Sequence, residues 1–390
     1  PNWFAPEGYA VPEAELDRED VLLNHNHAPA DHTGKVRERW SFRRSNYFEH
    51  VGNECRHVAD SVGLQDMSAF AKCYVTGPGA ETWLDSLMAN RIPKAVGRIH
   101  LCHMLTKNGG VRSEFTVYRS APQGFYLVSA GALERHDHDY LFKALPADGS
   151  VRIYPVTTQW GVLVLVGPHS RAVLQKLTDT DLSNRSFPWL TGKKIDVGHA
   201  QAHALRVNFV GELGWELHHP IEMQNTIFDL VMDAGREFGI KPFGIRAMMS
   251  MAIEKSYRLI GRELSIEYAA LESGLQRFVH LNKGQFLGRD ALVEWQQRGF
   301  EWQFVTMDVG GVTDADARGS EPLWSGDRLV GRATNGGYGF RLGKSLALGM
   351  VRPDHAEIGT ELDIQILGER RRATVIAESP YDPDNARLRA

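Results

Sequence analysis

The feature that most constrains the fold is a short motif that occurs twice in the chain. Residues 77–80 read Gly-Pro-Gly-Ala, and residues 167–170 read Gly-Pro-His-Ser. Each copy follows an apolar stretch that is typical of a strand, and leucines occur at the same two helical offsets behind both copies. Proline in the first turn of a helix, after a glycine turn, is typical of a strand-to-helix junction. The repeat therefore predicts two similar α+β units rather than one continuous sheet.

A glycine-rich turn between the two copies brings a glutamate onto a strand. Residues 101–105 and 115–118 have the composition of strands, and residues 106–110 contain the Asn-Gly-Gly sequence that favours a hairpin turn. The return strand carries Glu114. Considered alone, a glutamate at such a position is most often a solvent-facing residue of an edge strand.

A second hairpin is predicted further along the chain. Residues 205–209 alternate between apolar and polar side chains, as a half-buried strand does. Gly211 and Gly214 then predict a tight turn, after which Glu216 lies on the return strand, on the face opposite Trp215. This carboxylate needs a hydrogen-bonding partner because an unpaired buried charge is costly. A structural ion pair is the more common role for such a glutamate, and the hairpin alone leaves a binding role open.

Composition narrows the functional classes. The 390 residues are 43% hydrophobic and 24% charged, which is ordinary for a soluble globular protein and enough for two or three domains. The net charge is −4 with lysine and arginine spread along the chain, so nothing indicates binding to nucleic acid or to a membrane surface. No apolar run reaches the roughly 20 residues that cross a bilayer. Three scattered cysteines, Cys55, Cys73 and Cys102, do not predict a disulfide framework and favour a reducing cytoplasm or organelle matrix.

The chain divides into three regions that differ in amino-acid composition and periodicity. Residues 1–40 are rich in proline, histidine and aspartate without sustained periodicity, which predicts an extended N-terminal arm. Residues 41–300 hold the two α+β units, and residues 301–390 show short strands with glycine turns that predict a separate β domain. Because the chain begins at Pro1 without a methionine, we expect it to be processed or to be the downstream part of a longer polypeptide.

Two histidine clusters do not match recognised metal sites. His25, His27 and His32 lie in the arm without the spacing of such a site. Residues 136–139 read His-Asp-His-Asp on an expected helix, where side chains two positions apart point to different faces. We therefore predict no metal site. The sequence also contains neither a glycine-rich nucleotide-binding loop nor a nucleophile elbow.

Five segments resemble motifs of the aminomethyltransferase family, which includes the glycine cleavage T-protein. They occur in the expected order at residues 109–117, 209–216, 250–258, 336–339 and 344–351. Within the family, the chain is most similar to the C-terminal, tetrahydrofolate-binding half of dimethylglycine and sarcosine dehydrogenases. The resemblance implies an α+β fold of three domains around a central opening that holds folate. The first two domains are interleaved in sequence, and the third is a C-terminal β-barrel.

The resemblance also implies a reaction. In the related enzymes a flavin domain oxidises an N-methyl amine to an iminium, and N5 of tetrahydrofolate captures the carbon as 5,10-methylenetetrahydrofolate. The expected small molecules are thus folate and a methylated amine similar to dimethylglycine or sarcosine. FAD is expected only on a missing upstream domain or a partner chain, which makes a flavoprotein domain or subunit the expected partner.

Four residues are carried over to the folate site by the resemblance. Glu114 takes the position near N5 where the family usually has aspartate, and is the expected catalytic base. Glu216 matches the glutamate that binds the pterin through paired hydrogen bonds. Phe209 lies where relatives often have tyrosine, and Tyr338 is assigned with it to cofactor binding.

One helix departs from the family pattern. Relatives commonly read Arg-x-Ser-x-Arg-x-Glu or Leu-x-Ser-x-Arg-x-Glu where this chain has Met248, Ser250, Ala252 and Glu254, so an arginine common in the family is replaced by Ala252. Two alternatives therefore stay open. The chain could be a non-catalytic assembly module of a flavoprotein dehydrogenase, or a folate-dependent demethylase that acts directly on another methyl donor.

Overall fold

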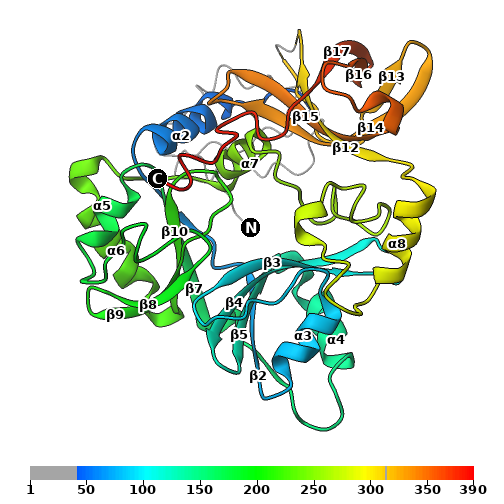
Figure 1. Ribbon diagram of the computed structural model, residues 1–390. Coiled ribbons are helices and arrows are strands. Elements are labelled where there is room, and N and C mark those ends of the chain that lie inside the picture. The colour runs from blue at the N-terminus through cyan, green and yellow to red at the C-terminus, as the bar shows by residue number, and fades with distance from the viewer. Residues whose placement is uncertain (1–41, 312–313) are drawn as a thin grey trace, which may run out of the picture.

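The computed structural model describes residues 42–311 and 314–390, whose strands form two sheets and one closed barrel arranged around the centre of the molecule (Figure 1). The arm and its histidines lie outside the described residues. The first sheet has five strands in the order β3 (Ile99–Leu105), β4 (Val111–Ala121), β5 (Gly124–Ser129), β2 (Ala71–Thr76) and β6 (Arg152–Pro155). The second has six, in the order β8 (Gly192–Val197), β9 (Ala200–Leu205), β10 (Gly214–Pro220), β7 (Trp160–Val166), β1 (Gly63–Asp66) and β11 (Lys241–Pro242).

The two sheets exchange a strand. The order β3-β4-β5-β2-β6 in one sheet repeats as β8-β9-β10-β7-β1 in the other. Strand β1 directly precedes β2 in the chain but pairs with β7, whereas β6 directly precedes β7 but pairs with β2. The prediction of two similar, interleaved α+β units is therefore confirmed.

The repeated glycine-proline motif lies at the same junction in both units. Gly77 and Gly167 follow β2 and β7 with φ angles of 119° and 120°, a conformation that side chains rarely adopt. A Cβ atom at Gly77 would clash with the carbonyl oxygen of Ser150, and one at Gly167 with that of Ser61. Both positions therefore require glycine, which explains why the motif is visible in the sequence.

Helices cover the outer faces of the sheets. On the five-stranded sheet lie α3 (Ala80–Leu87) and α4 (Glu134–Lys143), whose buried residues share a core with β2, β4 and β5. On the six-stranded sheet lie α5 (Ser170–Gln175) and α6 (Gln224–Ala234), packed against Trp215 and Leu217. The opposite face of that sheet receives α2 (Phe48–Asp60) and α7 (Ile245–Glu254).

The C-terminal strands close a barrel. Its order is β12 (Gln303–Val309), β15 (Lys344–Val351), β14 (Arg328–Gly339), β13 (Pro322–Ser325), β16 (Glu361–Ile366) and β17 (Glu369–Ile376). Helix α8 (Arg289–Arg298) precedes it in the chain. The predicted C-terminal β-barrel is confirmed, while the domain boundaries at residues 40 and 300 stay predictions.

The second hairpin is present, but the predicted tight turn is wrong. Strand β9 ends at Leu205 and β10 begins at Gly214, so residues 206–213 form a longer loop. The side chain of Asn208 accepts hydrogen bonds from the amides of Val210 and Gly211, at 3.1 Å each, and donates to the carbonyl of Glu212 at 2.8 Å. These side-chain hydrogen bonds hold the loop in place of the backbone hydrogen bonds of a β-hairpin.

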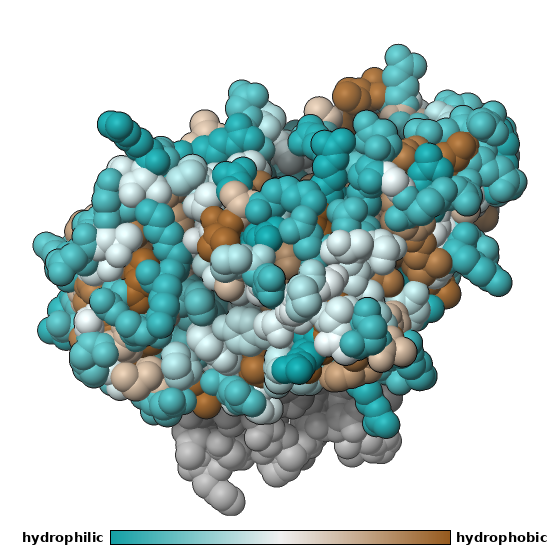
Figure 2. All heavy atoms as spheres, turned by 60° about the horizontal axis from the view of Figure 1, so that its bottom comes forward, coloured by the Kyte–Doolittle hydropathy of each residue, from teal (hydrophilic) through white to brown (hydrophobic). Residues whose placement is uncertain are grey.

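The described surface is mostly hydrophilic, with small, separate hydrophobic patches in the view of Figure 2. Cys55, Cys73 and Cys102 are buried free thiols. Within residues 42–311 and 314–390, no cluster of His, Cys, Asp or Glu is arranged to hold a metal ion, and no helix is long and apolar enough to cross a membrane.

Candidate functional site

The two sheets meet through the faces that α3 to α6 leave uncovered. Tyr118 and Tyr126 of the five-stranded sheet pack in one buried cluster with Leu205 of the six-stranded sheet. Glu114 lies on the same face as Tyr118, because side chains alternate along β4. Glu216 of β10 is the register partner of Leu205 on β9 and lies on the face opposite Trp215. The structure therefore puts both predicted glutamates on sheet faces that turn toward each other.

Glu114 is held by a buried histidine on the neighbouring strand. His103 is its register partner on β3, and the distance from His103 Nε2 to Glu114 Oε2 is 2.9 Å. The imidazole is fully buried, whereas the Glu114 side chain is 25% exposed. His103 Nδ1 has no partner among the described residues, so a proton there would be a buried donor without an acceptor. Nε2 therefore carries the proton and donates to Glu114.

Glu216 has a similar partner on its own strand. His218 is two residues further along β10 on the same face, with its Nε2 3.1 Å from Glu216 Oε2. Its Nδ1 is 3.1 Å from the hydroxyl of Tyr126, which belongs to the other sheet. The imidazole is fully buried, and the Glu216 side chain is 12% exposed. One oxygen of Glu216 is thus bonded to a histidine, which can be neutral. Glu216 forms no ion pair with an arginine or lysine of the described chain.

A second buried carboxylate in the same hairpin region has a different environment. Glu212 accepts hydrogen bonds from Arg341 at 2.9 Å, from Arg387 at 2.8 Å and from the Tyr381 hydroxyl at 2.7 Å. Arg341 also forms an ion pair with Glu254 at the end of α7. Burial raises the pKa of Glu254, and Arg341 opposes this effect. The two carboxylates and two guanidinium groups join the hairpin loop, α7, the barrel and the C-terminal segment.

The Arg341 cluster lies at the same end of α7 as Ala252. Glu212 and Glu254 flank the end of α7, and both are paired with arginine from segments that follow the helix in the chain. Ala252 is 2% exposed and leaves no carboxylate unpaired beside it. The sequence reasoning missed this cluster, because Arg341 lies 87 residues after Glu254 and carries no local signal.

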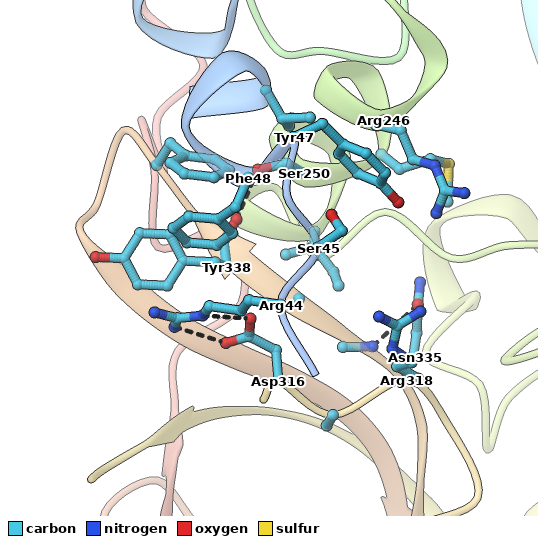
Figure 3. Close-up of a pocket in the computed structure, with 17 residues that line it drawn as sticks. Arg44, Ser45, Tyr47, Phe48, Arg246, Ser250, Asp316, Arg318, Asn335 and Tyr338 are labelled. Carbon is cyan, nitrogen blue, oxygen red and sulfur yellow. Dashed lines mark hydrogen bonds and ion pairs between the residues drawn. The ribbon is translucent and has the colours of Figure 1, made fainter. Parts of the chain in front are cut away.

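Phe209 and Tyr338 lie in different surroundings. The Phe209 ring is 5.2 Å from that of Tyr257 and belongs to the core under α2 and α7. Tyr338 lines a cavity of about 190 Å³ whose wall comes from residues 44–51, α7 and the barrel (Figure 3). Its ring is 5.2 Å from Phe48 and 4.6 Å from the Arg44 guanidinium. Neither predicted glutamate lines this cavity, so the structure does not bring Tyr338 to them. The roles of all four residues stay predictions.

Two family models match the chain. One, described as the GCVT N-terminal domain, matches residues 3–283, and the other, the glycine cleavage T-protein C-terminal barrel domain, matches residues 303–382. The chain belongs to the glycine cleavage T-protein family. The predicted resemblance to aminomethyltransferases is therefore confirmed. This is a family of folate-dependent enzymes.

Individual relatives agree with this assignment. The chain is 38% identical over 353 residues to mitochondrial dimethylglycine dehydrogenase of Mus musculus, covering 90% of this chain and 40% of that protein. It is 29% identical over 411 residues to mitochondrial sarcosine dehydrogenase of Homo sapiens, covering 100% and 44%. It is also 28% identical over 335 residues to an aminomethyltransferase of a Thermoanaerobacter species, covering 86% and 90%. The chain thus spans less than half the length of the two dehydrogenases.

A solved structure agrees with the fold. Aminomethyltransferase T of the glycine cleavage system from Bartonella henselae superposes with a TM-score of 0.77 at 22% sequence identity. The match covers 85% of this chain and 90% of the other. It confirms the predicted three-part fold of interleaved units and barrel.

Proposed function

We propose that the chain binds tetrahydrofolate between the two sheets and transfers a one-carbon unit to it from an oxidised N-methyl amine, with 5,10-methylenetetrahydrofolate as the product. The observation that carries this proposal is the pair of glutamates on facing sheets. Each has one oxygen held by a fully buried histidine and a side chain that is still partly exposed. The similarity to proteins named dimethylglycine and sarcosine dehydrogenase supports a small N-methyl amino acid as the source of the carbon.

The residues present fit the ligand. The pterin ring offers adjacent N–H donors, and the two oxygens of a carboxylate accept such a pair without supplying a competing donor. His218 engages only Oε2 of Glu216, so Oε1 can accept one donor and the second lone pair of Oε2 the other. Tyr118 and Tyr126 are buried in the cluster between the two sheets and support the layer on which Glu216 lies. Tyr338 lines a separate cavity that neither glutamate lines.

The proposed chemistry assigns one role to each glutamate. Tetrahydrofolate supplies two nitrogens to the carbon: N5 adds to the iminium carbon, and N10 then replaces the amine on it, so the amine leaves in protonated form. Glu114 accepts the proton that N5 loses and passes it to the departing amine, and its negative charge stabilises the cationic substrate before the first bond forms. His103 holds Oε2, which leaves Oε1 of Glu114 to take the proton. Glu216 binds and orients the pterin.

The oxidation itself needs a partner. The chain spans 40% of the dimethylglycine dehydrogenase that it matches, and we assign FAD and the amine oxidation to a domain or subunit outside this chain. The relatives described as mitochondrial support the organelle matrix among the two compartments predicted from the cysteines. A purely structural assembly role is the alternative, and it predicts a stable complex with the flavoprotein but no binding of folate.

Titration of the chain with tetrahydrofolate tests the proposal. Saturable quenching of tryptophan fluorescence is expected for the wild type. Glu216→Ala should weaken binding by about 100-fold, since it removes hydrogen bonds to a charged acceptor. Glu222→Ala is the matched control, because this exposed glutamate follows the same strand and should leave affinity unchanged. Folded wild-type protein that binds no tetrahydrofolate at millimolar concentration would contradict the proposal.

A further inference from the structure

A chain of three buried polar groups connects the two sheets and ends at Glu216. Tyr126 of β5 reaches Nδ1 of His218 at 3.1 Å, and Nε2 of His218 reaches Glu216 Oε2 at 3.1 Å. Tyr126 and His218 are both fully buried. Their direct bond crosses from the five-stranded to the six-stranded sheet, so the orientation of Glu216 depends on how the two units pack.

When Glu216 is ionised and the imidazole of His218 is neutral, the contacts allow one arrangement of protons. A carboxylate can only accept, so His218 Nε2 carries a proton and donates to Glu216. A neutral imidazole then has a lone pair on Nδ1, which accepts the hydroxyl proton of Tyr126. Burial holds the pKa of Tyr126 well above its ordinary value, so the hydroxyl remains a donor. Both nitrogens of His218 and the Tyr126 hydroxyl are satisfied in this arrangement.

The charged neighbour on this side is Lys194, which is exposed and pairs with His203 across β8 and β9. His203 is the cross-strand neighbour of His218, and its ring stacks on Tyr126 with centroids 6.3 Å apart. Burial lowers the pKa of His203 to about 4, which keeps it neutral. Tyr74 reaches His203 Nε2 at 3.4 Å. The hydrogen bond from His218 is therefore the side-chain contact that holds the Glu216 carboxylate among the described residues.

We propose that His218 and Tyr126 are positioning residues for the pterin-binding carboxylate. His218 fixes one oxygen of Glu216 and keeps the other turned toward the ligand, and Tyr126 fixes the tautomer of His218. This inference rests on the proposed function, because it assumes that Glu216 contacts the pterin. It adds that folate affinity is set in part by the contact between the two sheets.

The first test measures tetrahydrofolate affinity of the full chain by tryptophan fluorescence. His218→Leu should weaken binding by about 30-fold, because the hydrogen bond to the charged Glu216 is lost. His218→Gln keeps an N–H that can reach Glu216 and should restore affinity to within about fivefold of wild type. Tyr126→Phe keeps the ring and its packing, loses only the neutral hydrogen bond, and should weaken binding by about fivefold.

His219 is the matched control for structural damage. It is also fully buried on β10, but on the opposite face, where it bonds to the Leu217 carbonyl at 3.0 Å and to Gln224 at 2.8 Å. His219→Leu should lower the melting temperature without changing folate affinity. An equal loss of affinity in the His218 and His219 variants would overturn the inference, because both effects would then be structural.

A double-mutant comparison separates this inference from the proposed function. In a Glu216→Ala background, adding His218→Leu should cause no further loss of affinity, since the carboxylate that His218 positions is gone. If wild type binds tetrahydrofolate and Glu216→Ala weakens it, but Tyr126→Phe and His218→Leu do not, the inference fails and the proposed function stands. If Glu216→Ala itself has no effect, the proposed function fails. Tyr126→Phe decides the matter if His218→Leu does not fold.

Discussion

Two regions of this molecule hold buried glutamates in opposite ways. In the Arg341 cluster, Glu212 and Glu254 are at most 1% exposed and are paired with arginine, and the Glu212 carboxylate accepts three hydrogen bonds in all. On the facing sheets, Glu114 and Glu216 each accept one hydrogen bond from a histidine, and their side chains remain partly exposed. The first region leaves little capacity for a ligand, and the second leaves an oxygen available on each side chain.

The difference shows that the role of a buried glutamate depends on its partner. Glu212 and Glu216 are four residues apart in one hairpin region. Glu212 is bonded to guanidinium groups, whereas Glu216 is bonded to His218, which in turn bonds to a tyrosine. An arginine partner compensates the buried charge, and removing the arginine leaves that charge uncompensated. A histidine partner fixes geometry without neutralising the carboxylate, which preserves its capacity to bind or accept a proton.

The largest expected effect concerns the Arg341 cluster. Arg341→Met leaves Glu254 without its guanidinium and removes one of two arginines from Glu212. We expect a loss of about 4 kcal/mol in the free energy of unfolding, measured by urea denaturation, because both carboxylates stay buried. Arg328→Met, which removes an exposed barrel arginine 3.9 Å from Asp354, should cost less than about 1 kcal/mol. A drop in folate affinity without a loss of stability in Arg341→Met would contradict the comparison.

The next effect concerns Glu114. Glu114→Gln keeps the size of the side chain and can still accept a bond from His103, but it cannot take a proton. We expect the rate of methylenetetrahydrofolate formation, measured with a dimethylglycine-oxidising flavoprotein, to fall about 100-fold while tetrahydrofolate affinity changes little. Glu294→Gln, on the exposed face of α8, is the control and should change neither quantity. A variant that loses affinity in proportion to rate would indicate that Glu114 binds the ligand and does not act as a base.

Local sequence signals predicted much of this architecture. Glycine at 77 and 167 is required by backbone geometry, so the duplicated junctions were visible, and the Asn-Gly-Gly turn correctly joined β3 and β4. The tight turn before Glu216 was wrong, because the side chain of Asn208 and the ion pair of Glu212 reorganise the loop. The alternation of apolar and polar residues along a strand does not predict either contact.

The partners of the site were not predictable in the same way. His103 and Glu114 are eleven residues apart across a hairpin, so their pairing follows once the register is known. Tyr126 and His218 are 92 residues apart on different sheets, and Arg341 and Glu254 are 87 apart. Such contacts depend on tertiary packing, which explains why the carboxylates could be named from sequence and resemblance, whereas the groups that distinguish their roles could not.

The smallest expected effect tests the neutral character of the facing sheets through pH. Burial lowers the pKa of His203 from 6.5 to about 4, so the unfolded chain binds more protons than the folded one between these values. The stability that the neutral ring contributes is therefore fully present above pH 6.5 and is lost as the pH falls toward 4. We expect this loss to be about 2 kcal/mol, allowing for partial solvent screening.

His203→Gln tests this assignment, because glutamine keeps a polar group beside Tyr74 but does not titrate. Urea unfolding between pH 7 and 4 should show a shallower acid loss in this variant than in wild type, while His199→Gln, at an exposed position next to β9, should match wild type. A residual slope is expected in all three proteins, because burial also lowers the pKa of His219 and His57. An unchanged slope in His203→Gln would mean that the layer between the sheets tolerates an additional charge. The neutral surroundings that distinguish Glu216 from Glu212 would then not be a requirement of the fold.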